Sequence, residues 1–173
     1  MKKLNSMLFA FVLSMGLVGF SNINAGAELR GQERTCGAGP QKRIVTLTAA
    51  EKMVDLGEGV KTEAWTFNGT SPGPTIEACE GDTLKLTLKN EGKMAHGFDS
   101  HALRINPMHF GPADSGKSLS LDGKLSTPGV FMYHCASGAA TDQHIKMGMF
   151  GTMIVYPRSQ KLRPAREIVI SEN

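Results

Sequence analysis

The 173-residue sequence has no basic run interleaved with aromatic residues, the usual footprint of a nucleic-acid-binding protein. After the first 27 residues it also has no hydrophobic run long enough to cross a membrane. No long segment shows the spacing of an amphipathic helix, and no internal repeat or low-complexity tract is present. We therefore expect no nucleic-acid partner, no membrane insertion of the mature chain and no helical bundle.

The first 27 residues have the three parts of a secretory signal peptide. Lys2 and Lys3 form a basic start, residues 7–20 form a short apolar core, and small residues at 25–27 resemble a cleavage site. An uncleaved anchor is the alternative, but the apolar run is short for a membrane span. The sequence predicts a periplasmic or secreted protein with an arm at 28–42, one domain at 43–158 and a tail at 159–173.

Short segments with the pattern of β-strands fill the predicted domain. Residues 83–89 alternate polar and apolar side chains, so one face of this segment is expected to be buried. Turn signals such as Asn68-Gly69 and Asp122-Gly123 separate the runs. This pattern predicts an all-β, single-domain Greek-key β-sandwich. The other β-rich runs are 44–47, 63–67, 129–133 and 152–156.

Residue types that bind metals follow the run that ends near residue 134. Cys135 is followed after eight residues by His144, and after four more by Met149. A thiolate and two imidazoles in a plane, with a weak axial thioether, are the ligands of a type 1 (blue) copper site. The second imidazole must come from elsewhere, and His96 is the candidate. The alternative is that these side chains are structural or core residues.

A second group follows from the alternation of side chains along a strand. His134 points away from its neighbour Cys135, and Asp99 and His101 lie at odd offsets from His96, on the opposite face if no bulge intervenes. Two imidazoles suit a second copper, and a carboxylate beside them suits proton handling. The third imidazole would be His109, from the same chain or across a subunit interface. A structural role for these histidines stays open.

The sequence has three cysteines, and an odd number in an exported chain leaves at least one cysteine outside an intramolecular disulfide. With Cys135 as a metal ligand, Cys36 and Cys79 are left. An oxidising compartment favours a disulfide between them, and two isolated thiols are the alternative.

Longer motifs resemble the first cupredoxin domain of copper-containing nitrite reductases and, more broadly, the multicopper oxidases. The resemblance covers about residues 43–158. It implies a cupredoxin fold, a type 1 copper on the four residues above, a type 2 copper on His101 and His134, and a proton-handling role for Asp99. The motifs are Phe67 to Pro74, Glu80-Gly81-Asp82, His96-x-x-Asp99-x-His101, Pro128 to Ala136, Gly148 to Gly151 and Val155 to Arg158.

The sequence departs from that family in three places. The family's second cupredoxin domain supplies the third type 2 histidine and a second catalytic histidine from a neighbouring subunit, and the matching stretch here ends soon after Arg158. Residues 105–110 differ from a family loop rich in glycine and alanine. Residues 136–143 lack the family's aromatic residue before the histidine ligand.

Two functions follow as predictions. The leading one is a blue copper protein that carries single electrons between redox proteins, with an exposed edge of His144 as the electron entry. Met147 and Met153 are expected to be packing or loop residues, and an apolar docking patch at 147–153 is the alternative. The alternative is a homo-oligomeric, trimeric reductase that builds a type 2 copper from His101, His134 and a further histidine. Asp99 would then donate protons to nitrite or another small oxidant. Copper storage is disfavoured, because this ligand set suits redox chemistry.

Overall fold

The computed structural model describes residues 36–104, 111–163, 165 and 167–171. Its strands are β1 (Lys42–Asp55), β2 (Lys61–Phe67), β3 (Ile76–Cys79), β4 (Thr83–Asn90), β5 (Asp99–Ser100), β6 (Ser118–Lys124), β7 (Gly129–His134) and β8 (Phe150–Tyr156). A 3-10 turn η2 (Gly138–Ala140) and one short helix α1 (Thr141–Lys146) lie between β7 and β8. Over these ranges the protein has no helix with the length and apolar character of a membrane span.

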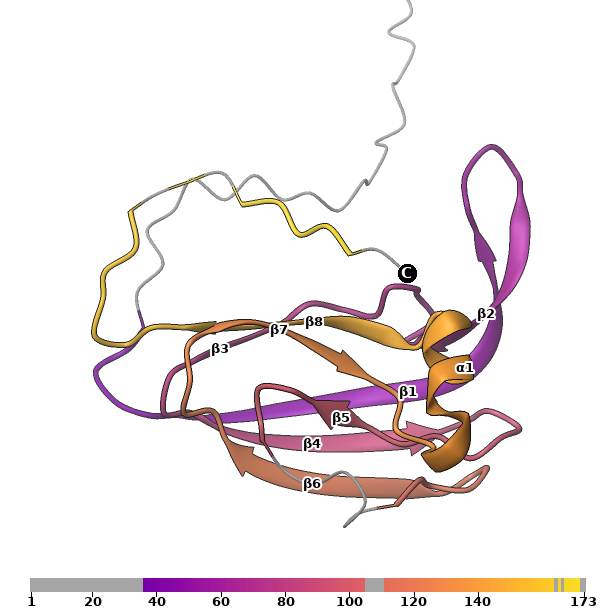
Figure 1. Ribbon diagram of the computed structural model, residues 1–173, viewed down its shortest axis with the longest axis horizontal. Helices are drawn as coiled ribbons and strands as arrows, with labels where there is room; N and C mark the ends of the chain where they lie inside the picture. Colours follow the sequence, from indigo (N-terminus) through magenta and orange to yellow (C-terminus); the bar gives the residue numbers. More distant parts are fainter. Residues whose placement is uncertain (1–35, 105–110, 164, 166, 172–173) are drawn as a thin grey trace, which may run out of the picture.

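The strands form two mixed sheets that pack face to face (Figure 1). The first sheet has the order β2-β1-β4-β6 and the second the order β3-β8-β7-β5. Each sheet contains one parallel pair, β1 with β4 and β3 with β8, and its other pairs are antiparallel. The predicted all-β sandwich is confirmed.

The core lies between the two sheets and follows the predicted alternation of β4. Leu84, Leu86 and Leu88 are fully buried, while the residues between them face outward. They pack in one cluster with side chains of the opposite sheet, including Tyr133 of β7 and Val155 of β8. Burial of each such side chain stabilises the fold by roughly 1.5–3 kcal/mol, so this face fixes the register of β4.

One predicted turn is correct and one is wrong. Asn68 and Gly69 both have positive φ angles, 56° and 77°, the conformation that a two-residue turn of this kind requires. Asp122 and Gly123, in contrast, lie inside β6 and pair with β4. The strand continues through them because Leu121 is buried in the core and the pairing with β4 runs on to residue 124.

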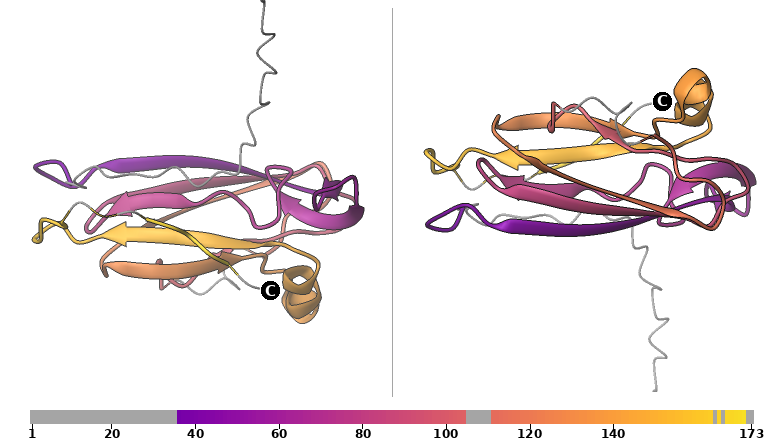
Figure 2. Two further views of the ribbon diagram at one scale, coloured as in Figure 1. Left: turned by 90° about the horizontal axis from the view of Figure 1, so that it is seen from above. Right: turned by 90° about the horizontal axis from the view of Figure 1, so that it is seen from below.

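The two ends of the sandwich carry different features. Helix α1 and the β1–β2 hairpin lie at one end, and the start of β1 and the end of β8 lie at the other (Figure 2). The named strands fall between residues 42 and 156. The predicted signal peptide at 1–27 and most of the predicted arm lie outside the described residues, so the domain boundaries stay predictions.

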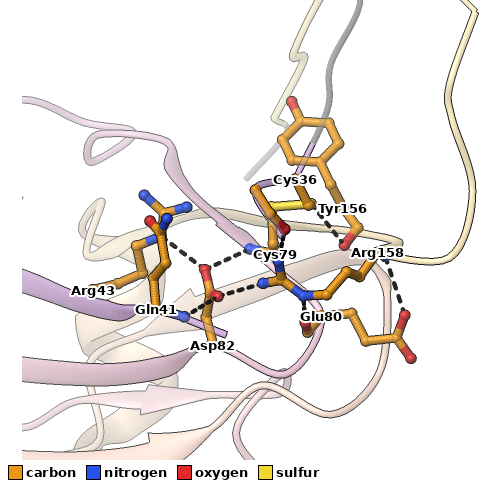
Figure 3. Close-up of a disulfide and its surroundings, with 9 residues drawn as sticks. Cys36, Gln41, Arg43, Cys79, Glu80, Asp82, Tyr156 and Arg158 are labelled. Carbon is orange, nitrogen blue, oxygen red and sulfur yellow. Dashed lines mark hydrogen bonds and ion pairs between the residues drawn. A yellow bond between two sulfur atoms is a disulfide. The ribbon is translucent and has the colours of Figure 1, made fainter. Parts of the chain in front are cut away.

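A disulfide closes the end at which β1 starts. Cys36 and Cys79 are bonded, as favoured from the sequence, and join the segment before β1 to the end of β3 (Figure 3). The same segment is held by Arg158, whose guanidinium donates to the carbonyl of Gly37 at 2.5 Å. Residues 36–41 are therefore anchored to the sandwich by a covalent and a polar contact.

Asp82 lies beside this disulfide and is fully buried. One carboxylate oxygen accepts hydrogen bonds from the Gln41 amide at 2.8 Å and from Arg158 at 2.6 Å. The other accepts from Arg43 at 2.8 Å and from the Cys79 amide at 3.0 Å (Figure 3). Burial raises the pKa of Asp82, but Arg43 and the Gln41 and Cys79 amides outweigh it, and the pKa lies below its usual value. The charge is thus buried with a complete set of partners.

Candidate metal centre

Three predicted ligands converge inside the sandwich: His96, Cys135 and His144. The Nδ1 atom of His144 lies 3.2 Å from the Cys135 sulfur, and the Nδ1 atom of His96 lies 3.8 Å from it. The two Nδ1 atoms are 3.1 Å apart. His96 and Cys135 are fully buried and His144 is 4% exposed. All three donor atoms therefore face one small volume within the protein.

The loop after β7 brings Met149, the predicted axial ligand, back towards Cys135. The amide of Cys135 donates to the carbonyl of Met149, and the amide of Met149 donates to the carbonyl of His144, both at 3.0 Å. Helix α1 carries His144 within this loop. Met149 is fully buried and belongs to the same core cluster as Cys135. The short spacing from cysteine to histidine to methionine thus closes into one compact turn of chain.

Gly97 allows the segment that carries His96 to approach this loop. Its amide donates to the Cys135 sulfur at 3.4 Å. A Cβ atom at residue 97 would collide with the backbone carbonyl of Ala136. His96 itself is held by paired backbone hydrogen bonds with Ala113, at 3.0 and 2.9 Å. Glycine is required here because two backbone segments cross without room for a side chain.

The electrostatics of the cluster fit a metal ion. Burial raises the pKa of the Cys135 thiol to about 11, although the Gly97 amide acts in the opposite direction. Burial also lowers the pKa of His96 and of His144, with a smaller opposing effect from Glu51. All three groups are therefore neutral near pH 7, and their Nδ1 and sulfur atoms face one another. A soft or borderline cation would satisfy these donors and deprotonate the thiol.

The second predicted group also comes together, where β5 pairs with β7. Asp99 lies opposite His134 in this pairing. The Nε2 atom of His134 is 3.3 Å from Nε2 of His101 and 3.9 Å from a carboxylate oxygen of Asp99. His101 is exposed, Asp99 is partly buried and His134 is 8% exposed. The cluster is therefore open to solvent, unlike the first.

The orientation of His134 is set by its neighbour in the chain. Its Nδ1 atom lies 2.8 Å from the carbonyl oxygen of Cys135, and a carbonyl only accepts, so Nδ1 donates. The Nε2 lone pair is then directed at His101. The structure thus forms the two groups expected from strand alternation, on either side of one peptide bond. Metal binding by each stays a prediction, and His109 lies outside the described residues.

The expected exposure of His144 is wrong, because the residue is only 4% exposed, and its role in electron entry stays a prediction. The ring of Trp65 packs edge-on against His144, with centroids 4.6 Å apart, and covers it. The packing role expected for Met147 and Met153 is confirmed, because Met153 is fully buried and Met147 packs against the core. The alternative, an apolar docking patch at 147–153, is wrong. These flexible apolar side chains fill space in the core and so are not available at the surface.

Residues 48–160 match the family described as multicopper oxidase, and this stretch is more than half of the chain. The chain belongs to the multicopper oxidase family. Its structural neighbours among nitrite reductases and multicopper oxidases share the cupredoxin-like sandwich.

Copper-containing nitrite reductases are among the similar proteins of this family. The one from Pseudomonas chlororaphis is 35% identical over 127 residues, covering 70% of this chain and 35% of the relative. The solved nitrite reductase of Thermus scotoductus has a TM-score of 0.67 at 35% identity, covering 69% and 28% of the two chains. That of Nitrosomonas europaea has a TM-score of 0.65 at 39% identity, covering 68% and 42%. The chain spans about a third of the length of the curated relatives that it matches.

Two residues lie beside the candidate centre of this multicopper oxidase family member that sequence reasoning did not identify. Glu51 contacts His96, with 3.2 Å between a carboxylate oxygen and Nε2, and Trp65 covers His144. Trp65 is the single tryptophan of the chain, which is the one weak signal that marked it. Nothing local marked Glu51, because its contact depends on how β1 passes the loop before His96.

Proposed function

We propose that this chain is an exported type 1 copper protein that transfers single electrons, with His96, Cys135, His144 and Met149 as ligands. The observation that carries the proposal is the convergence of two imidazole nitrogens on a buried thiol, within 3.8 Å. The similar proteins are copper-containing by name, which supports the choice of metal. Copper in such a ligand set supplies one-electron redox chemistry.

The residues around the ligands suit that role. Full burial of His96, Cys135 and Met149 excludes water from the centre and limits movement of the ligands when the charge changes. The hydrogen bond from Gly97 to the sulfur is the kind of contact that tunes a reduction potential. Ordered ligands and a dry site favour electron transfer over release of the metal.

Export to the periplasm or beyond is part of the proposal. The first 27 residues support it, and so does the Cys36–Cys79 disulfide, because such bonds persist in oxidising compartments. The partners would be a redox protein that donates electrons and one that accepts them.

The test is copper loading of the purified mature protein, followed by absorption and quantitative EPR spectroscopy. We expect an intense thiolate-to-copper absorption and one narrow-hyperfine signal per chain, both lost reversibly on addition of one electron. A colourless protein, or one whose only copper signal has wide hyperfine splitting, would contradict the assignment. Loading with zinc is the control for stabilisation by metal without redox chemistry.

The Asp99, His101 and His134 cluster favours a second candidate, a nitrite reductase-like enzyme. The similar proteins include copper-containing nitrite reductases, and their name supports nitrite as the substrate. The cluster holds two imidazoles whose Nε2 atoms lie 3.3 Å apart, with a carboxylate close enough to handle protons. A third histidine, from the same chain or from another subunit of a trimer, would complete it.

This candidate is tested on the same copper-loaded protein. It predicts an additional wide-hyperfine EPR signal approaching one per chain, a trimer by light scattering, and consumption of nitrite with a reduced electron donor. His101→Ala should remove the second signal and the activity while the narrow-hyperfine signal stays. If the wild-type protein shows one copper per chain and no nitrite consumption, the electron carrier is the function that stands.

A further inference from the structure

One cross-strand pair of the β1–β2 hairpin faces both imidazoles of the enclosed cluster. Glu51 lies directly opposite Trp65 in the register, so the two side chains lie on the same face of the sheet. Glu51 contacts His96, and Trp65 contacts His144. The hairpin therefore contributes to the surroundings of the site, although it supplies no predicted ligand.

The carboxylate of Glu51 is fixed by more than His96. The backbone amide of Lys93 donates to both of its oxygens, at 2.9 and 3.2 Å, and that of Met94 lies 3.4 Å from one of them. Buried Asn90 holds this loop by donating to the Met94 carbonyl and accepting from the Gly92 amide, at 2.6 and 2.9 Å. The position of Glu51 is thus determined by a chain of hydrogen bonds that starts at the end of β4.

Gly92 closes over the contact between Glu51 and His96. A Cβ atom at residue 92 would lie 2.8 Å from a carboxylate oxygen and 3.0 Å from Nε2 of His96. The carbonyl of Gly92 is held by the hydroxyl of Ser115 at 2.6 Å. The side chain of Glu51 is only 12% exposed. The contact is therefore enclosed, and the backbone leaves room for these two side chains and little else.

The contact decides which nitrogen of His96 is free. An ionised carboxylate only accepts, so Nε2 of His96 carries the proton and donates to Glu51. The lone pair then lies on Nδ1, the atom that faces Cys135. Both oxygens of Glu51 also accept hydrogen bonds from the Lys93 amide, which is the geometry of a carboxylate that acts only as an acceptor.

We infer that Glu51 is a positioning residue of the metal centre, which holds His96 in the tautomer that directs Nδ1 at the metal and stabilises the oxidised site by its negative charge. The inference rests on the proposed type 1 copper function. A buried negative charge near a metal favours the more positive oxidation state, Cu(II) over Cu(I). Loss of this charge should therefore raise the reduction potential.

Glu51→Gln tests the charge, because glutamine keeps the shape and can still accept a hydrogen bond from Nε2. Its matched control is Glu63→Gln, which removes the same charge from an exposed position on the same hairpin. We expect Glu51→Gln to raise the reduction potential and to weaken Cu(II) binding about 10–100-fold, with neither change in the control. Equal potentials and affinities in the two variants would overturn the inference.

Gly92→Ala tests the geometry of the contact while residue 51 stays a glutamate. The added methyl group displaces the carboxylate from His96, so we expect a shift of potential in the same direction and an altered narrow-hyperfine EPR signal. Gly39→Ala is the control, because a Cβ atom there would meet nothing within 4 Å. An unchanged potential and EPR signal in Gly92→Ala, as in Gly39→Ala, would count against the positioning role.

A measurement on the metal-free wild-type protein separates this inference from the proposed function. Long-range proton–nitrogen NMR of the histidine rings should show His96 protonated on Nε2. Protonation on Nδ1 would overturn the role of Glu51 even if the protein is blue. If the tautomer is as expected and no type 1 copper signal forms, the proposed function fails while the placement of Glu51 stands. This readout needs no variant to fold.

Discussion

The two ends of the sandwich bury polar groups in opposite ways. At one end Asp82 is ionised and each of its oxygens accepts two hydrogen bonds, from two arginines and two backbone amides. At the other end His96, Cys135 and His144 are buried as neutral groups whose Nδ1 and sulfur atoms face one another. The first set is complete within the protein, and a bound cation would complete the second.

The difference separates a structural polar cluster from a functional one. A buried charge costs several kcal/mol of solvation free energy unless partners replace the water, so the Asp82 cluster contributes to stability only as a complete set. Burial of neutral side chains costs less solvation free energy, so the folded core can hold the imidazoles and the thiol close together without a metal. The comparison predicts that changes at the Asp82 end alter stability, and that changes at the other end alter metal chemistry.

The largest expected effect is the complete loss of intense visible absorption in Cys135→Ser. The absorption of a type 1 site needs the thiolate, and serine is close in size to cysteine, so the fold should persist. Absorption spectroscopy of the copper-loaded variant measures the first point, and denaturant unfolding of the metal-free variant measures the second. A coloured variant would show that another residue supplies the sulfur ligand.

Asp82→Asn should lower the free energy of unfolding by about 3 kcal/mol, because it leaves two arginines without their carboxylate. We take the low end of the stability loss that follows removal of one partner from a buried ion pair, because the side chain of Arg43 is 37% exposed. Urea unfolding measures the change, with the exposed Asp122→Asn as control. The folded fraction should still give the type 1 absorption. A loss of colour at full folding would mean that the two ends are coupled.

Gly97→Ala should destabilise the metal-free protein by about 1–3 kcal/mol, because the new methyl group collides with the Ala136 carbonyl. It should also weaken copper retention, since the hydrogen bond from residue 97 to the sulfur of Cys135 is displaced. Thermal unfolding and competition with a chelator measure the two effects, with Gly39→Ala as control. A normal affinity in a destabilised variant would show that the crossing at Gly97 serves packing alone.

The smallest expected effect is a pH dependence that belongs to the Asp82 end. The pKa of Asp82 is lower in the folded protein than in the unfolded chain, where it is about 3.9. Its stabilising contribution is therefore present above about pH 4 and is lost as the pH falls through the folded pKa. The difference in unfolding free energy between wild type and Asp82→Asn should be constant from pH 5 to 7 and shrink below pH 4. A difference that stays the same at pH 3 would contradict this account.

Several features of this molecule could be predicted from local pattern alone. The alternation at 83–89 predicted β4 and its buried face, and Asn68-Gly69 predicted a tight turn. The spacing of Cys135, His144 and Met149 predicted a ligand loop, and strand alternation separated His134 from Cys135. These predictions concern residues close in the chain, for which the geometry of a strand or turn sets the direction of each side chain.

Other features were decided only by the tertiary structure. The burial of His144 under Trp65, the contact of Glu51 with His96 and the pairing of Arg158 with Asp82 join residues 45 to 79 positions apart. Asp122-Gly123 has the local pattern of a turn, yet pairing with β4 extends a strand through it. The sequence by itself determined the strands, the residue types of the candidate metal centre and their spacing. Sheet register and core packing determined which residues surround the ligands and how far the site is closed to water, because those contacts form only when distant strands pair.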